Sequence, residues 1–170
     1  MKEIMDEKMI QRSLIRMAHE IVEKNKGVDN LVLLGIKTRG ESLAFRLKKY
    51  IDSFEGSNVP CTSIDIKYWR DDIKLSGEKI PSIDVIVQDK IVILVDDVLF
   101  SGRTIRAAMD GVMYYGRASE IHLATLIDRG HRQLPIKADY VGKNVPTSND
   151  EKVTVHVKEN DEIDQVLIKS

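Results

Sequence analysis

Thirteen residues of this chain, Val92–Thr104 (VILVDDVLFSGRT), combine the features that binding of a phosphorylated sugar requires. The apolar run predicts a buried strand, the adjacent carboxylates of Asp96 and Asp97 follow at its carboxyl end, and a turn of small residues leads into a helix. In that turn, backbone N–H groups and the Ser101 hydroxyl would converge on a phosphate, and Gly102 would let the backbone approach it closely. The two carboxylates suit the neighbouring sugar hydroxyls, or a magnesium ion shared with other phosphates.

A structural interpretation of the same residues is also open, in which the acidic pair caps a helix and the SGRT segment is an ordinary loop. Two other nucleotide-binding patterns are excluded, because the chain contains neither GxxxxGK[ST] nor GxGxxG. A structural zinc site is excluded as well, since the single cysteine and the four histidines are scattered without metal-ligand spacing.

Length and composition are those of one globular domain. The chain has 170 residues, of which 42% are hydrophobic and 31% are charged, so disorder is not expected. The longest apolar run, Ile91–Val95, is far shorter than the roughly 18 residues of a membrane helix, and the first residues lack a signal-peptide core. We therefore expect a cytoplasmic protein without a membrane partner. The net charge is -1, but Arg129–Lys143 is basic and Asp150–Asp164 is acidic.

Strands and helices alternate along the chain, which predicts a parallel sheet covered on both faces, with ligands beyond the carboxyl ends of its strands. The predicted helices carry three apolar stripes: Ile10, Leu14, Met17 and Ile21; Leu43, Phe45, Leu47 and Ile51; and Ile105, Ala108, Met109, Val112 and Met113. The predicted strands are 31–36, 62–68, 90–95, 120–127, 152–157 and 165–169. We expect a turn from Asp96 to Thr104, a mobile polar loop from Arg70 to Asp84, and a turn-rich stretch over residues 128–147.

Val92–Thr104 resembles the phosphoribosyl pyrophosphate signature of the type I phosphoribosyltransferases. Other segments resemble one branch of that family, the regulators that attenuate pyrimidine operons and also act as uracil phosphoribosyltransferases. These segments are MAHEIVEKNKG (17–27), GIKTRG (35–40), YWRDDI (68–73), DRGHRQLPIKADYVGKNVPTS (128–148) and EKVTV (151–155). The resemblance implies the type I phosphoribosyltransferase fold, an α/β fold whose central parallel sheet is flanked by helices. It further implies a single domain over residues 1–170, with a flexible loop at 70–84 and a small hood subdomain at 128–157.

The resemblance implies transfer of ribose 5-phosphate from phosphoribosyl pyrophosphate to uracil, giving UMP and pyrophosphate. Magnesium would be held mainly by the substrate, with Asp96 as a contact through water and no metal site of the protein's own. Asp96 and Asp97 would bind the ribose hydroxyls, and the substrate-binding segment would continue through Val98, Leu99, Phe100, Ser101, Gly102, Arg103 and Thr104. Thr38 and Arg39 would meet the leaving diphosphate, in a loop that the family often holds in a cis peptide. The expected catalytic residues are thus Arg39, Asp96, Asp97 and Arg70.

Catalysis of this kind needs no protein nucleophile. If C1 of the ribose develops oxocarbenium character, the charge on the diphosphate must be neutralised by magnesium and Arg39 while water is excluded. The loop 70–84 is the natural lid, although it is several residues shorter than expected for this family. Backbone groups of the hood and of Val153 would read uracil, with Arg129 as the side-chain partner; the alternative for Arg129 is a salt bridge to an acidic surface residue.

The resemblance also implies RNA binding: with UMP or UTP in the site, the protein would bind a stem-loop of its leader mRNA and favour termination. The expected RNA-binding residues are Arg12, Arg16 and His19 on one helix face, and His131, Arg132, Lys137 and Lys143 in the basic stretch. The alternative for Arg12 and Arg16 is a solvated helix face. A homodimer or larger homo-oligomer is expected, because one small patch would bind weakly and two side by side would bind better.

Two other functions stay open at the level of sequence. One is a phosphoribosyltransferase for another base, such as hypoxanthine or orotate, without an RNA function. The other is a regulator that binds phosphoribosyl pyrophosphate or UMP but has lost turnover. The short loop favours loss of turnover, whereas Ile15, where the family usually has threonine, weakens the case for RNA binding.

Overall fold

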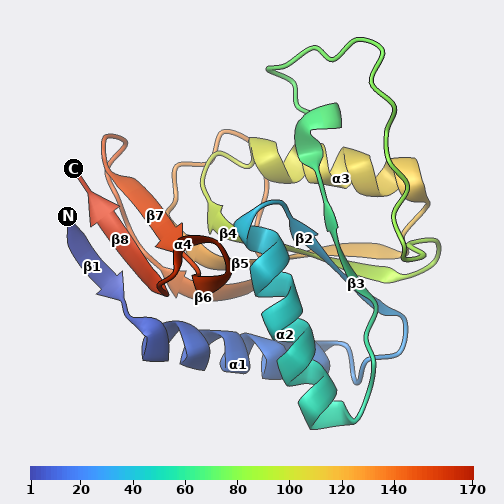
Figure 1. The fold of residues 1–170 in the computed structure, drawn as a ribbon, viewed down its shortest axis with the longest axis horizontal. Coiled ribbons are helices and arrows are strands. Elements are labelled where there is room, and N and C mark those ends of the chain that lie inside the picture. The colour runs from blue at the N-terminus through green and yellow to red at the C-terminus, as the bar shows by residue number, and fades with distance from the viewer.

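The computed structural model describes residues 1–170 and contains two sheets (Figure 1). The larger sheet has five parallel strands in the order β3-β2-β4-β5-β6. The strands are β2 (Leu31–Ile36), β3 (Cys61–Ile64), β4 (Ile91–Leu99), β5 (Glu120–Asp128) and β6 (Tyr140–Asn144). The smaller sheet is antiparallel, in the order β1-β8-β7, and consists of β1 (Lys2–Met5), β7 (Lys152–His156) and β8 (Gln165–Lys169). The predicted central parallel sheet is therefore confirmed.

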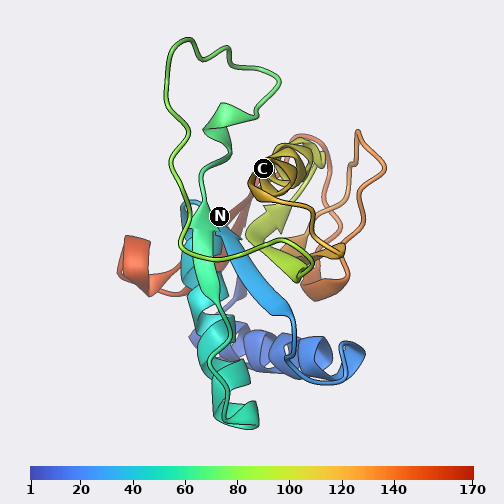
Figure 2. The ribbon, with the colours of Figure 1, turned by 90° about the vertical axis from the view of Figure 1, so that its right-hand side faces the viewer.

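Helices cover both faces of the parallel sheet, as Figures 1 and 2 show from two directions. The helices α1 (Glu7–Lys24) and α2 (Arg39–Glu55) pack on one face, and α3 (Arg103–Tyr115) packs on the other. Alternate residues of each strand point to opposite faces, so Leu33 belongs to the α1 and α2 layer of the core and Leu34 to the α3 layer. A short helix, α4 (Lys158–Asp161), lies in the connection between β7 and β8.

Two of the predicted helix stripes are wrong at one position each. Phe45 is 46% exposed and Met113 is 59% exposed. On α2 the buried stripe runs through Ala44 instead, and on α3 the buried position belongs to Val112. Both errors arise because the larger apolar residue stands directly after the small or branched residue that the 3.6-residue period places inward.

Two predicted strand boundaries also differ from the structure. The predicted strand 62–68 ends at Ile64, and a 3₁₀ turn over Ile66–Tyr68 follows, capped by the Asp65 carboxylate. The predicted turn after residue 95 is wrong in its first part, because β4 continues through both aspartates to Leu99. It continues because β5 offers a parallel partner along this whole length, with Leu99 opposite Asp128.

Three elements were not expected: β1, α4 and β6. The segment of β6 has a turn-rich sequence, and its strand state depends on pairing with β5, where Tyr140 lies opposite Ala124. Residues 128–157 are divided between the two sheets, with β6 in the parallel sheet and β7 in the small one. The loop 70–84 has no helix or strand and projects from the body of the molecule in Figures 1 and 2. None of the helices combines the length and apolar character needed to cross a membrane.

Candidate active site

Three predicted segments meet at the carboxyl edge of the parallel sheet: the GIKTRG loop after β2, the aspartates of β4, and the loop after β5. The approach of the first two is close enough to require a glycine. A Cβ atom on Gly40 would lie 2.4 Å from the carbonyl oxygen of Val95 and 3.2 Å from the Cα atom of Asp96. The GIKTRG loop therefore packs directly against the strand that carries the carboxylates.

Asp96 and Asp97 are fixed to the backbone at the end of β4. Asp96 is only 8% exposed, and its Oδ1 accepts a hydrogen bond from the Asp97 amide at 2.9 Å. The Asp97 carboxylate accepts from the Val98 amide at 2.7 Å. Burial raises the pKa of Asp96 well above its ordinary value, and the neighbouring charge of Asp97 raises it further. The pair presents two immobilised carboxyl groups, which suits recognition of sugar hydroxyls.

The turn between β4 and α3 has the backbone that a phosphate site needs. Gly102 has a φ of 95°, which favours glycine, and a Cβ atom there would make a tight contact of 3.0 Å with the Ile136 side chain. The Ser101 hydroxyl accepts from the Arg103 amide at 3.3 Å. The other N–H groups in the first turn of α3 have no acceptor within the helix, and a helix N-terminus favours an anion.

The loop 70–84 contacts this turn through its first residues. Arg103 donates to the Asp71 carboxylate at 2.9 Å, and the Arg70 guanidinium is paired with Asp72. A cavity of about 360 Å³ is lined by Arg70, Arg103 and Thr104, among others. The structure thus brings Arg70 beside the Gly102 turn, with its charge already paired with Asp72 inside the loop.

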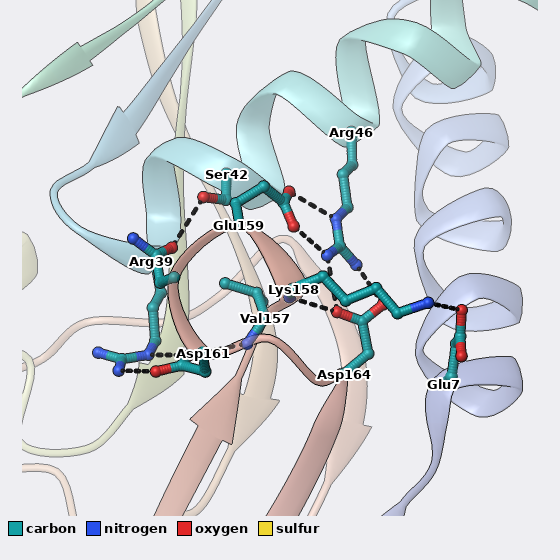
Figure 3. Close-up of polar contacts among 10 residues, drawn as sticks. Glu7, Arg39, Ser42, Arg46, Val157, Lys158, Glu159, Asp161 and Asp164 are labelled. Carbon is teal, nitrogen blue, oxygen red and sulfur yellow. Dashed lines mark hydrogen bonds and ion pairs between the residues drawn. The ribbon is translucent and has the colours of Figure 1, made fainter.

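The GIKTRG loop has the expected cis peptide between Lys37 and Thr38, and Arg39 begins α2. The Arg39 guanidinium pairs in a bidentate manner with Asp161 of α4, with Nε 3.0 Å from Oδ2 and Nη2 2.7 Å from Oδ1 (Figure 3). The hydrogen bond to Asp161 raises the pKa of Arg39, against the opposing effect of burial, and the charge of Asp97 adds to the rise. Asp161 was missed from the sequence, where its only signal was its place in the acidic stretch Asp150–Asp164.

Arg129 lies at the same edge, just after β5, and is only 7% exposed. Its guanidinium donates to the Thr147 hydroxyl at 3.2 Å and to the Ser148 carbonyl at 3.1 Å, and it lies 4.1 Å from the centre of the Phe100 ring. The alternative of a surface salt bridge is excluded, because no carboxylate pairs with this side chain. Val153 is a buried core residue of β7, and a role of its backbone toward a base stays a prediction.

The expected RNA-binding residues of α1 are exposed, and the structure brings one of them to β6. Arg16 donates to the carbonyls of Val141 at 3.2 Å and Gly142 at 2.6 Å. Lys143 follows directly in β6 and is exposed, as is Arg12 on α1. These contacts place part of the predicted basic stretch beside the polar face of α1. We refer to Arg12, Arg16 and Lys143 as the α1–β6 basic surface.

The remaining expected RNA-binding residues are placed differently. His19 is stacked on Phe54 of α2, with ring centres 3.9 Å apart. The Arg132 guanidinium donates to Asp128 at 2.6 Å and to two backbone carbonyls, and the His131 ring is hydrogen-bonded to a carbonyl of the neighbouring loop. Both side chains thus hold together the loop after β5. Lys137 is exposed.

The donor set of the site fits a magnesium ion only if the substrate supplies most of its ligands. No three His, Cys, Asp or Glu side chains are grouped so that they could hold a metal ion. Asp96 and Asp97 offer two adjacent carboxyl groups, and magnesium is commonly held by one or two carboxylates together with substrate phosphates.

Comparison with known proteins identifies the family. Residues 1–160 match the phosphoribosyl transferase domain. "Bifunctional protein PyrR" of Thermoanaerobacter sp. (strain X514) is 58% identical over 98% of this chain and 96% of its own length, and the protein of the same name from Staphylococcus haemolyticus is 52% identical over 98% and 97%. The fold is similar to that of a hypoxanthine phosphoribosyltransferase from Staphylococcus aureus, with a TM-score of 0.75 and 22% identity over 98% of this chain and 90% of that one. The chain belongs to the phosphoribosyltransferase family and, within it, to the family of the bifunctional PyrR proteins.

Proposed function

We propose that this protein transfers ribose 5-phosphate from phosphoribosyl pyrophosphate to uracil, and that a uridine nucleotide in the same site promotes binding to a stem-loop of pyrimidine-operon leader mRNA. The observation that carries the enzymatic half is the meeting of Arg39, the aspartate pair and the Gly102 turn at one sheet edge. Membership of the bifunctional PyrR family supports the regulatory half. Both activities belong in the cytoplasm, where the nucleotide precursors and the nascent mRNA are found.

In the proposed reaction the bond between ribose C1 and the diphosphate oxygen breaks, and a bond from C1 to uracil N1 forms as N1 loses its proton. Asp96 and Asp97 hold the ribose hydroxyls, and the first turn of α3 holds the 5-phosphate, so C1 is fixed between two anchors. Arg39 neutralises charge on the departing diphosphate. Magnesium, when bound through the diphosphate, supplies further neutralisation of the same charge. During the reaction the loop 70–84 closes over the site and excludes water.

The base is assigned to the space beside Arg129. Uracil presents two carbonyl acceptors and two N–H donors, and the Nη1 group of Arg129 has no hydrogen-bond partner in the structure. A cavity of about 370 Å³ lies at this position, lined by Arg129, Val145 and Pro146, among others. A buried guanidinium without a carboxylate partner is well suited to donate to a uracil carbonyl.

The α1–β6 basic surface is the proposed RNA contact. One subunit offers few cations there, so we propose that the RNA is bound by a homodimer that presents two such surfaces. Sedimentation with and without a leader stem-loop tests this, and tight binding by a monomer would contradict it. A fluorescence titration of the stem-loop should show tighter binding when UMP or UTP is present.

The enzymatic proposal is tested by measuring UMP and pyrophosphate formation from uracil with and without magnesium, with hypoxanthine, guanine and orotate in parallel. We expect turnover with uracil alone, dependent on magnesium. Transfer to another base in place of uracil would favour the phosphoribosyltransferase without an RNA function. No turnover with any base, while phosphoribosyl pyrophosphate or UMP still raises the melting temperature, would favour a regulator that has lost turnover.

A further inference from the structure

The short helix α4 is fixed to the start of α2 by a row of polar contacts (Figure 3). Arg46 of α2 pairs with both Glu159 and Asp164. One turn earlier on α2, the Ser42 hydroxyl is hydrogen-bonded to Asn160 at 3.0 Å. On the other side, Lys158 pairs with Glu7 of α1. The β7–β8 connection is therefore held in one place relative to the GIKTRG loop, which leads into α2.

Asp161 is the residue of this helix that reaches Arg39. Its two carboxylate oxygens accept from Nε and Nη2 of Arg39, and Oδ2 also accepts from the Val157 amide at 2.9 Å. The Asp161 side chain is 16% exposed, whereas the Arg39 side chain is 36% exposed. The Nη1 group of Arg39 has no hydrogen-bond partner. One edge of the guanidinium is thus taken up by Asp161, and the remaining nitrogen is left for an anion.

We infer that Asp161 is a positioning residue for the transfer: it fixes one edge of the Arg39 guanidinium so that Nη1 meets the leaving diphosphate. The inference rests on the proposed function, in which Arg39 neutralises the diphosphate. A planar guanidinium that is held by a bidentate carboxylate cannot rotate freely. Binding of the diphosphate therefore costs less side-chain conformational entropy.

The opposite role, in which Asp161 competes with the diphosphate for Arg39, fits the structure less well. A competing carboxylate would have to withdraw when substrate binds. Asp161 instead accepts a hydrogen bond from the Val157 amide. Its helix α4 is also held by Ser42 and Arg46, which lie one turn apart on α2. An anchored carboxylate holds its arginine in place rather than releasing it.

The test compares Asp161→Asn with Glu159→Gln. Both remove one carboxylate charge from α4 and keep the shape of the side chain, but Glu159 pairs with Arg46, which keeps Asp164 as a partner. For Asp161→Asn we expect kcat/KM for phosphoribosyl pyrophosphate to fall about tenfold to a hundredfold, the cost of misplacing one group at a reacting centre. The fall should lie mainly in kcat, with KM for uracil unchanged, and Glu159→Gln should behave as wild type.

A double-mutant cycle separates positioning from a structural role. In an Arg39→Ala background, Asp161→Asn should change kcat/KM by less than about twofold, because its effect passes through Arg39. Equal losses in the Asp161→Asn and Glu159→Gln variants, with equal drops in melting temperature, would overturn the inference. So would tighter binding of phosphoribosyl pyrophosphate by Asp161→Asn, which is the result that competition predicts.

The inference and the proposed function fail in different ways. Wild-type protein that forms no UMP would contradict the proposed function. In that case calorimetric titration with pyrophosphate still tests whether Asp161 positions Arg39. The Asp161→Asn variant should bind pyrophosphate more weakly than the wild-type protein and than the Glu159→Gln variant. Wild-type turnover of uracil, with no difference between wild type and Asp161→Asn, would leave the proposed function standing and overturn the role of Asp161.

Discussion

The guanidinium of Arg103, at the start of α3, donates to the carboxylate of Asp71 at 2.9 Å and so ties the loop 70–84 to the turn between β4 and α3. Both side chains are largely exposed, 49% and 42%, and a pair of this kind contributes about 1 kcal/mol or less. A 5-phosphate bound at the same turn would compete for Arg103. The contact is therefore weak enough to break and reform as substrate comes and goes.

Replacing Asp71 by Asn should loosen the loop 70–84. We expect faster cleavage by trypsin at Lys74 and Lys79, because the contact that holds the start of the loop to α3 loses the carboxylate charge and is weakened. Asp72→Asn is the control, since Asp72 pairs with Arg70 inside the loop. Time courses of limited proteolysis check this, and equal cleavage rates in the two variants would show that Asp71 does not hold the loop.

Asp97→Asn should abolish transfer while the fold is kept. The carboxylate accepts from the Val98 amide, which an Asn side-chain oxygen can still do, so the structural loss is small. The loss of a charge that holds the ribose hydroxyls should lower kcat by about a hundredfold or more. Melting curves and an assay of UMP formation test both parts, with Asp110→Asn, which lies further along α3 and pairs with Arg106, as the control. Normal turnover in Asp97→Asn would contradict the role given to the aspartate pair.

Asp96→Asn should stabilise the protein near neutral pH. Burial and the charge of Asp97 raise the pKa of Asp96 in the folded state above the ordinary value of 3.8. As pH rises past 3.8, the unfolded chain loses this proton first, so the folded state becomes less stable relative to it. The variant has no proton to lose, so its advantage in melting temperature should grow as the pH rises above about 4. A difference in melting temperature that stays constant as the pH rises would contradict this cause.

Arg46→Met should lower the free energy of unfolding by about 2 to 4 kcal/mol, because Asp164 is left buried without its partner. Glu159 loses its ion pair at the same time. Arg106→Met removes the exposed pair with Asp110 and should change stability by less than about 1 kcal/mol. Urea denaturation of the two variants gives the comparison, and equal small effects would mean that α4 is not held by Arg46.

Lys143→Gln should weaken binding of a leader stem-loop in the presence of UMP and leave uracil transfer intact. Loss of one phosphate contact should also reduce the slope of log affinity against log salt by about 0.7 to 0.9. Arg117→Gln, which removes an exposed arginine between α3 and β5, serves as the control. Arg132 is unsuitable for this test, because its guanidinium holds the loop after β5. Equal loss of both activities in Lys143→Gln would contradict separate sites.

The sequence predicts the fold well where strands are buried on both faces. The apolar runs of β2 and β4 are typical of strands in the middle of a parallel sheet, and the predicted bounds of β2 match the structure. The end of β4 was predicted less well. The sequence around the two aspartates is typical of a turn, and they lie in a strand because that strand pairs with β5. A local sequence pattern carries no information about this pairing between strands.

The candidate site divides in the same way. The aspartate pair, Gly102 and Arg39 lie in short contiguous motifs, and the resemblance to a known family placed them. Asp161 lies 122 residues from Arg39 in sequence, and an aspartate among other acidic residues carries no sign of its partner. For Arg132 the sequence pattern was misleading. Its place in a basic stretch predicted an RNA contact, but its guanidinium is hydrogen-bonded to Asp128 and to two backbone carbonyls.

In the small sheet, β8 lies between β1 and β7, with Lys2 opposite Ile168 and Val155 opposite Val166. During synthesis the chain emerges from the ribosome from its N-terminus onward. The strands β1 and β7 therefore have no strand to pair with until residues 165–169 of β8 have left the exit tunnel. The parallel sheet and the Gly102 turn can form before then, but the small sheet, whose β7–β8 connection carries Asp161, cannot. A nascent chain should therefore form the framework of the proposed nucleotide site first and the contact between Asp161 and Arg39 afterwards.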